Sequence, residues 1–151
     1  MGRMKLWASL YGMIWLVFVQ IWLGYTPIAP PVPLYLHIVL GIGVLALAAD
    51  NFVELRKSTC PGRIKRIARA TLALAVFMAV LGVLLYLNIG ANWNIAWGIS
   101  IGSGIHFLHF VNAMAILSQV SAVAVVYDVW EEKEFLNSTA PGEIPPPAGP
   151  K

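Results

Sequence analysis

Three histidines are the residues of this chain whose type and spacing could do chemistry. They are His37, His106 and His109, and the sequence contains no other histidine. His106 and His109 are three residues apart, which places both on one face of a helix. All three lie in long segments without Asp, Glu, Lys or Arg, where an ionisable side chain is rare and indicates a functional site. Neutral imidazole is also the commonest metal ligand, so metal binding is the first chemistry to consider.

The depth of each histidine can be estimated from the nearest charged residue along its segment. His37 precedes Arg56 by 19 residues and His109 precedes Asp128 by 19 residues, which is about 28 Å of helix in each case. His106 lies about 33 Å from Asp128 by the same measure. Imidazoles from two helices at one depth are suited to be the axial ligands of a b-type haem. The sequence therefore predicts haem b, with His37, His106 and His109 as candidate iron ligands.

Glycines near these histidines fit the same prediction. Gly41 follows His37 by four residues, Gly102 precedes His106 by four, and Gly82 lies within another apolar segment. A flat porphyrin needs close approach of the backbone, which glycine permits. Small residues at this spacing also pack membrane helices together without any cofactor, and Gly98 with Gly102 could form such a contact within a homodimer. Equal depth favours His109 as the second ligand and glycine spacing favours His106, so both remain open.

Other roles for the histidines are also open. A membrane histidine can hydrogen-bond across helices to a polar side chain. The candidate partners are Tyr35, Ser100, Ser103, Asn112, Ser118 and Gln119. Copper would require softer ligands; Met114 is available, but Cys60 is predicted on the far side of the membrane. His109 could also serve a quinone or proton site.

Two carboxylates lie at the other end of the His37 segment. Asp50 and Glu54 are four residues apart and share one helix face. The sequence favours ion pairs with nearby cations, and the alternative is an acid through which a proton enters. The candidate cations are Arg56, Lys57 and Arg69.

The elements that must position these residues follow from composition and charge. Of the 151 residues, 59% are hydrophobic and 11% are charged, and the mean hydropathy is +0.75. A soluble domain carries about 25% charged residues, so an ordinary soluble protein is excluded. Residues 6–49 and 70–127 contain no charge, and each run is long enough for two membrane spans of about 20 residues. Proline-rich residues 27–33 and turn-forming residues 88–94 interrupt them.

We therefore predict an all-α fold, a polytopic membrane four-helix bundle. Its helices are expected at about residues 5–25, 34–56, 66–89 and 97–134, within a transmembrane domain of residues 1–136. Residues 137–151 are rich in proline and are expected to form a disordered cytoplasmic tail.

Basic residues predict the orientation of the spans. They gather at the N-terminus and between the second and third helices, whereas the other two connections carry no charge. The positive-inside rule then places both termini in the cytoplasm of a multi-pass protein of the plasma membrane. The same residues suit anionic membrane surfaces better than nucleic acid. These residues are Arg3, Lys5, Arg56, Lys57, Arg63, Lys65, Arg66 and Arg69.

The order of these features resembles one four-helix half of a haem A synthase. Each half of that enzyme has a histidine on its second and fourth helices; the matching segments here are residues 36–41 and 105–109. The family has a glutamate shortly before the first histidine and an arginine directly after it, whereas this chain has Leu36 and Ile38 around His37. The resemblance thus implies a four-helix haem cradle, as in a small membrane cytochrome b, rather than the hydroxylation chemistry of the enzyme.

The resulting hypothesis is a haem b protein that transfers electrons within a respiratory complex, with quinol or other membrane subunits as partners. We expect an electron-transfer subunit rather than an independent catalyst, because the sequence contains no hydrolytic, phosphate-loop or dinucleotide motif. The alternative is an accessory or assembly subunit without a cofactor in a larger membrane complex, such as a terminal oxidase. A transporter is a third option, although internal repeats and broken helices are not evident.

Overall fold

The structure is a computed structural model that describes residues 3–25, 32–91, 93–96 and 99–139 of the chain. These residues form four helices and one small sheet. The helices are α1 (Arg3–Tyr25), α2 (Val32–Lys57), α3 (Gly62–Tyr86) and α4 (Ile101–Thr139), and the strands are β1 (Asn94–Ala96) and β2 (Ile99–Ser100). Each helix contains a segment long and apolar enough to cross a membrane. The prediction of a four-helix, all-α bundle is confirmed.

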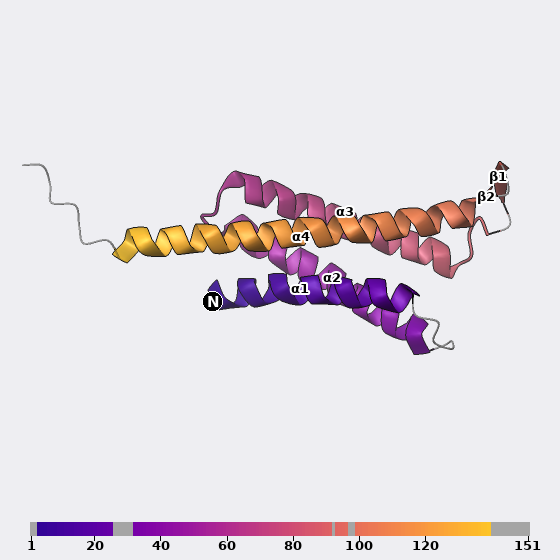
Figure 1. Cartoon of the computed structure of the whole chain (residues 1–151), viewed down its shortest axis with the longest axis horizontal. Helices are drawn as coiled ribbons and strands as arrows, with labels where there is room; N and C mark the ends of the chain where they lie inside the picture. The colour runs from indigo at the N-terminus through magenta and orange to yellow at the C-terminus, as the bar shows by residue number, and fades with distance from the viewer. Residues whose placement is uncertain (1–2, 26–31, 92, 97–98, 140–151) are drawn as a thin grey trace, which may run out of the picture.

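The helices run alternately up and down and form a bundle (Figure 1). α1 and α3 each pack against both α2 and α4, so α2 and α4 face each other across a diagonal of the bundle. We call the end that holds the start of α1 and the α2–α3 connection the basic end, and the opposite end the histidine end. α4, with 39 residues, is about 58 Å long and extends past the other helices at the basic end (Figure 1).

Local chemistry explains where α3 begins and ends, which differs from the predicted residues 66–89. Pro61 occupies the N-cap position, and because proline does not continue a preceding helix it separates α3 from α2. The other end is fixed by Asn88 and Gly90, which have φ angles of 54° and 77°, in the left-handed region that Asn and Gly tolerate best. α3 therefore starts four residues earlier and ends three residues earlier than predicted.

The predicted start of the fourth helix at residue 97 is wrong. Residues 99–100 form β2, which pairs antiparallel with β1, and α4 begins at Ile101. The Ser100 hydroxyl accepts a hydrogen bond from the Ser103 backbone N–H at 3.1 Å, which is the geometry of a helix N-cap. The backbone N–H groups of Ile101 and Gly102 donate to the carbonyls of Trp93 and Gly90. The first donors of α4 are thus satisfied by the turn before it.

The predicted disorder from residue 137 is also wrong in part. α4 continues to Thr139, because residues 131–136 contain good helix formers and no proline. The rest of the predicted tail, residues 140–151, lies outside the described residues.

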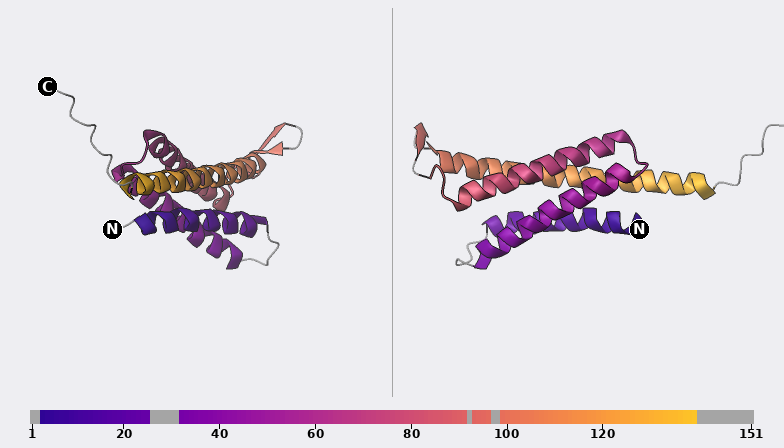
Figure 2. Two further views of the ribbon diagram at one scale, coloured as in Figure 1. Left: turned by 60° about the vertical axis from the view of Figure 1, so that its left-hand side comes forward. Right: turned by 180° about the vertical axis from the view of Figure 1, so that it is seen from behind.

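The apolar core is concentrated towards the basic end. Leu10, Met13 and Leu55 are at most 2% exposed, whereas no residue from 34 to 43 on α2 is buried. In Figures 1 and 2 the α1–α2 pair diverges from the α3–α4 pair towards the histidine end. The bundle is therefore closed at one end and open at the other.

Candidate functional site

A pair of histidines crosses the open half of the bundle. The ring centres of His37 on α2 and His109 on α4 are 6.1 Å apart, and the ring planes are inclined by 42°. Because α2 and α4 are diagonal rather than adjacent helices, the pair lies between α1 and α3. The structure thus brings together the two histidines that were expected at the same depth.

Each ring of the pair has a nitrogen that lacks a partner. The Nδ1 atoms of His37 and His109 are buried and form no hydrogen bond within the described part of the chain. A buried polar atom without a partner costs about 1–3 kcal/mol, and native structures contain few of them. These two atoms therefore indicate that a ligand, a metal or water completes this site.

Four of the six predicted hydrogen-bond partners of the histidines form hydrogen bonds with other groups. Asn112 donates to the backbone carbonyl of Leu74 at 2.9 Å, and Gln119 accepts from Thr71 at 3.0 Å. Ser100 and Ser103 bond to each other. These candidate partners are thus engaged elsewhere.

Gln20 holds the His37 segment in place, and it was not singled out in the sequence. Its side-chain Nε2 donates to the backbone carbonyl of His37 at 2.6 Å. A Cβ atom at Gly41 would lie 3.2 Å from that Nε2, so glycine leaves room for the bond. Gln20 is the only amide side chain in the apolar span of α1, and this is the signal that could have identified it.

The three predicted glycines have different neighbours. A Cβ atom at Gly82 on α3 would lie 3.6 Å from Cε1 of His109, so Gly82 forms one wall of the histidine site. Gly41 faces Gln20 instead. Gly102 packs against Ala91, whose Cα would be 3.1 Å from an added Cβ, and its contact is with the turn before α4. Gly98, its predicted partner in a homodimer contact, lies outside the described residues.

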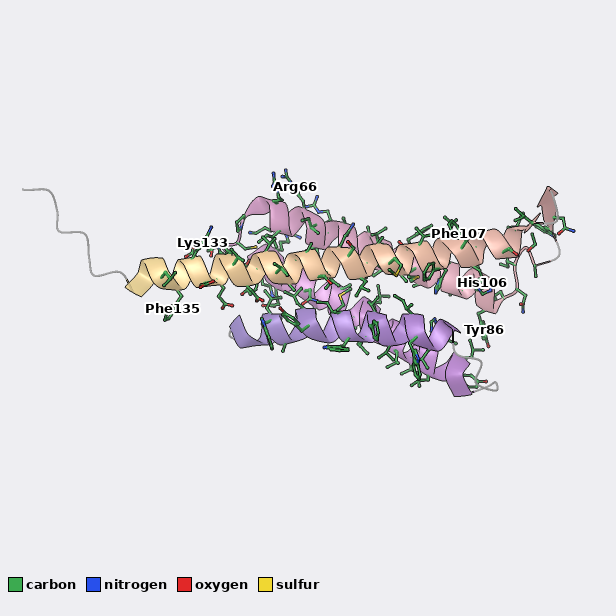
Figure 3. The ribbon with its side chains drawn as sticks, viewed as in Figure 1. Arg66, Tyr86, His106, Phe107, Lys133 and Phe135 are labelled. Atoms are coloured by element: carbon green, nitrogen blue, oxygen red, sulfur yellow. The ribbon has the colours of Figure 1, made fainter. Side chains whose placement is uncertain are left out.

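His106 is more exposed than either member of the pair. It is exposed, and Figure 3 shows it near the start of α4. His109, one turn further along α4, is less exposed and carries the unpartnered nitrogen. The geometry thus favours His109 over His106 as the partner of His37.

The histidine pair could supply the two protein ligands that haem requires. Within the described segments, no group of three or more His, Cys, Asp or Glu side chains is arranged to hold a metal ion. Haem needs only two axial protein ligands, because the porphyrin supplies the other nitrogens. His37 and His109 could supply two such ligands, because their ring centres are 6.1 Å apart and each ring has a buried Nδ1 without a partner among the described residues.

A second polar cluster lies in the closed half and has different properties. Asn51 is 4% exposed and Thr71 is 5% exposed. Asn51 donates to the sulfur of Met13 at 3.7 Å, and its Oδ1 has no partner among the described residues. Asn51, Thr71 and Met13 line a cavity with about 10 Å³ accessible to the centre of a water molecule, which is close to the minimum for one water. This cluster, which the sequence analysis did not identify, contains no titratable group.

The carboxylates near the basic end have local partners. Glu54 forms an ion pair with Lys57 at 3.3 Å, which is one of the predicted alternatives. Asp50 accepts a 3.5 Å hydrogen bond from Ser9, and Asp128 accepts one of 2.9 Å from Tyr11. The bonds from Ser9 and Tyr11 connect α1 to α2 and to α4.

Comparison of the chain with known protein families, curated proteins and solved structures found no match. The histidine site must therefore be interpreted from its own geometry.

Proposed function

We propose that this protein is a multi-pass membrane protein that binds one haem b between His37 and His109 and transfers electrons. The observation that carries the proposal is the pair of imidazoles at 6.1 Å across the bundle diagonal, each with a buried and unpartnered nitrogen. When bound, haem would supply a one-electron carrier. The role of the chain would be to hold the iron from both sides and to surround the porphyrin with apolar side chains.

Each helix would contribute to the haem site. α2 and α4 would supply the two ligands, Gly82 on α3 would leave space beside His109, and Gln20 on α1 would fix the backbone at His37. The open packing of residues 34–43 supports this proposal, because a porphyrin needs space that a closed apolar core does not leave. The positive-inside rule supports a cytoplasmic basic end, which would place the histidine pair in the outer half of the membrane.

The deciding experiment is a reduced-minus-oxidised visible spectrum of protein purified in detergent after expression with added haem. We expect the sharp α-band of low-spin haem with two histidine ligands. His37→Ala and His109→Ala should each abolish that band, while His106→Ala, the matched control, should retain it. Membrane insertion should be unchanged in all three variants. A featureless spectrum from folded, helical wild-type protein would refute haem binding, and full haem retention in His37→Ala would refute the ligand assignment.

One observation favours a second candidate, an accessory subunit of a membrane complex. α4 extends beyond the bundle at the basic end, where Phe135 and Leu136 are 59% and 58% exposed. Figure 3 shows Lys133 and Phe135 on this extension. Such a surface could contact another subunit of a redox complex. If this is its main function, histidine variants would alter assembly of the complex and the purified protein would be colourless.

A further inference from the structure

A groove between α2 and α3 opens to the outside of the bundle. Its volume is about 300 Å³, and its lining is entirely apolar. Leu45 lines it from α2, and Val76, Ala79, Val80, Val83 and Leu84 line it from α3. In the right-hand view of Figure 2, α2 and α3 are close together at their connection and diverge away from it. An apolar groove of this volume suits a hydrocarbon chain.

Two arginines lie on the same sides of these helices, nearer the basic end. Arg69 precedes Val76 by seven residues and Arg56 follows Leu45 by eleven residues. These spacings are about two and three helical turns, so each arginine shares the face that lines the groove. Within the described residues, neither guanidinium forms a hydrogen bond or an ion pair, and both side chains are exposed.

Lys65 shows that the two arginines lie at a common corner of the bundle. Its ammonium group donates to the backbone carbonyls of Ser58 at 2.7 Å and of Arg56 at 3.3 Å. Lys65 is one turn before Arg69 on α3, so this contact brings that face of α3 to the end of α2. Positive charge is therefore concentrated at the basic end of the two helix faces, on α2 and α3, that line the groove.

We propose that this surface binds an anionic phospholipid, with the phosphate between Arg56 and Arg69 and one acyl chain in the groove. The length is suitable, because Arg69 lies about 10 Å along the helix axis from Val76 and about 16 Å from Val80. The hydrocarbon of one leaflet is about 15 Å thick, so a chain whose headgroup is at Arg69 reaches the middle of the groove. Arginine pairs with phosphate through two parallel hydrogen bonds. In a zwitterionic headgroup, the cation partly neutralises the charge of the phosphate, so the arginines should prefer an anionic lipid.

The test uses vesicles of equal phosphatidylglycerol and phosphatidylcholine. The full chain is reconstituted, extracted in mild detergent, and the retained lipid is identified by native mass spectrometry. Wild-type protein should retain phosphatidylglycerol in preference to phosphatidylcholine. Arg56→Gln with Arg69→Gln should lower that preference by about 25-fold, or about fivefold for each charge removed.

Matched controls separate this site from general attraction between charges. Arg63→Gln with Lys133→Gln removes the same charge, but Arg63 is about 140° around α3 from Val76 and Lys133 is on α4. This control should lower the preference much less than the variant of Arg56 and Arg69 does. Ala79→Phe should fill the groove and lower phosphatidylglycerol retention, while Ala122→Phe on an exposed face of α4 should not.

Equal retention of the two lipids by wild-type protein, or equal losses in the two double variants, would overturn the proposal. Loss of retention in the arginine variant without any effect of Ala79→Phe would overturn the assignment of the acyl chain to the groove. None of these measurements requires haem, so the lipid proposal can fail or hold independently of the proposed function.

Discussion

Both halves of the bundle place polar side chains between helices, but their packing differs. In the closed half, Asn51 and Thr71 are almost completely buried, and Thr71 is bonded to Gln119. In the open half, His37 and His109 are only partly buried, yet each has a buried Nδ1 without a partner. Hydrogen-bonded polar groups between membrane helices contribute to association of the helices. Ionisable groups without a hydrogen-bond partner in an open region instead indicate a site for a ligand, a metal or water.

Apolar packing differs in the same way. Leu10, Met13 and Leu55 fill the closed half, and this is where most of the hydrophobic contact between helices occurs. The open half has few buried apolar residues on α2, and there the side chain of Gln20 on α1 is hydrogen-bonded to the backbone carbonyl of His37 on α2. The comparison indicates that apolar packing is concentrated in one half of the molecule, whereas the candidate binding site lies in the other.

The largest expected effect tests the closed half. Met13 is fully buried and lines the cavity beside Asn51. Met13→Ala should lower the free energy of unfolding by about 2–5 kcal/mol, because it removes buried contacts and enlarges a cavity. Unfolding can be followed by circular dichroism during titration with a denaturing detergent. Met114→Ala, at a position 46% exposed, is the matched control and should change the free energy by less than about 1 kcal/mol. Equal effects at the two positions would contradict the role of Met13 in the apolar core of the closed half.

An intermediate effect is expected at the wall of the histidine site. Gly82→Leu should displace His109 and lower haem affinity about tenfold, which corresponds to about 1.4 kcal/mol. Gly82→Ala should be tolerated, because its Cβ would be at an ordinary contact distance from His109. Haem titration followed by absorbance measures both variants. Gly104→Leu is the control, because an added Cβ at Gly104 meets nothing within 4 Å. Unchanged affinity in Gly82→Leu would show that the wall is not part of a haem site.

The smallest effect is expected at Asn51, and it tests how the polar cluster of the closed half differs from the histidine pair. Asn51→Leu removes an Oδ1 atom without a partner and a weak contact to the Met13 sulfur. The free energy of unfolding should therefore change by less than about 0.5 kcal/mol, since replacing an unsatisfied polar group by an apolar one is nearly neutral. The same detergent titration provides the measurement. A loss greater than about 1 kcal/mol would mean that a water in the cavity satisfies Asn51, and the contrast with the histidine pair would then be weaker.

The sequence was most informative where the physical signal is strong and local. Charge-free segments and the proline cluster predicted the four helices, because membrane-spanning length and helix breaking depend on consecutive residues. It was less accurate at the start of α4, where Ser100 caps the helix only in combination with a turn built by Gly90 and Trp93. The extension of α4 through residues 135–139 was missed for a related reason, since the proline-rich composition of the tail outweighed the local helix propensity.

For the candidate site, helix length gave the common depth of His37 and His109 but not their contact. Depth is a one-dimensional property that counting residues can provide. Which faces of α2 and α4 turn towards each other depends on the packing of all four helices, and this also explains why His106 is exposed. Gln20 and Gly41 show the same limit, because their contact joins two helices whose rotation the sequence does not specify.

The sequence by itself determined that this chain has four apolar helices, that its basic residues gather at one end, and that its only histidines lie within the helices. These properties follow from the cost of burying charge and from the fixed rise of a helix. Only the tertiary structure decided that His37 meets His109 across the diagonal, that Gly82 borders the pair, and that one half of the bundle is open. Side-chain packing between helices fixes these features, because it sets the rotation and tilt of each helix and therefore which residues meet.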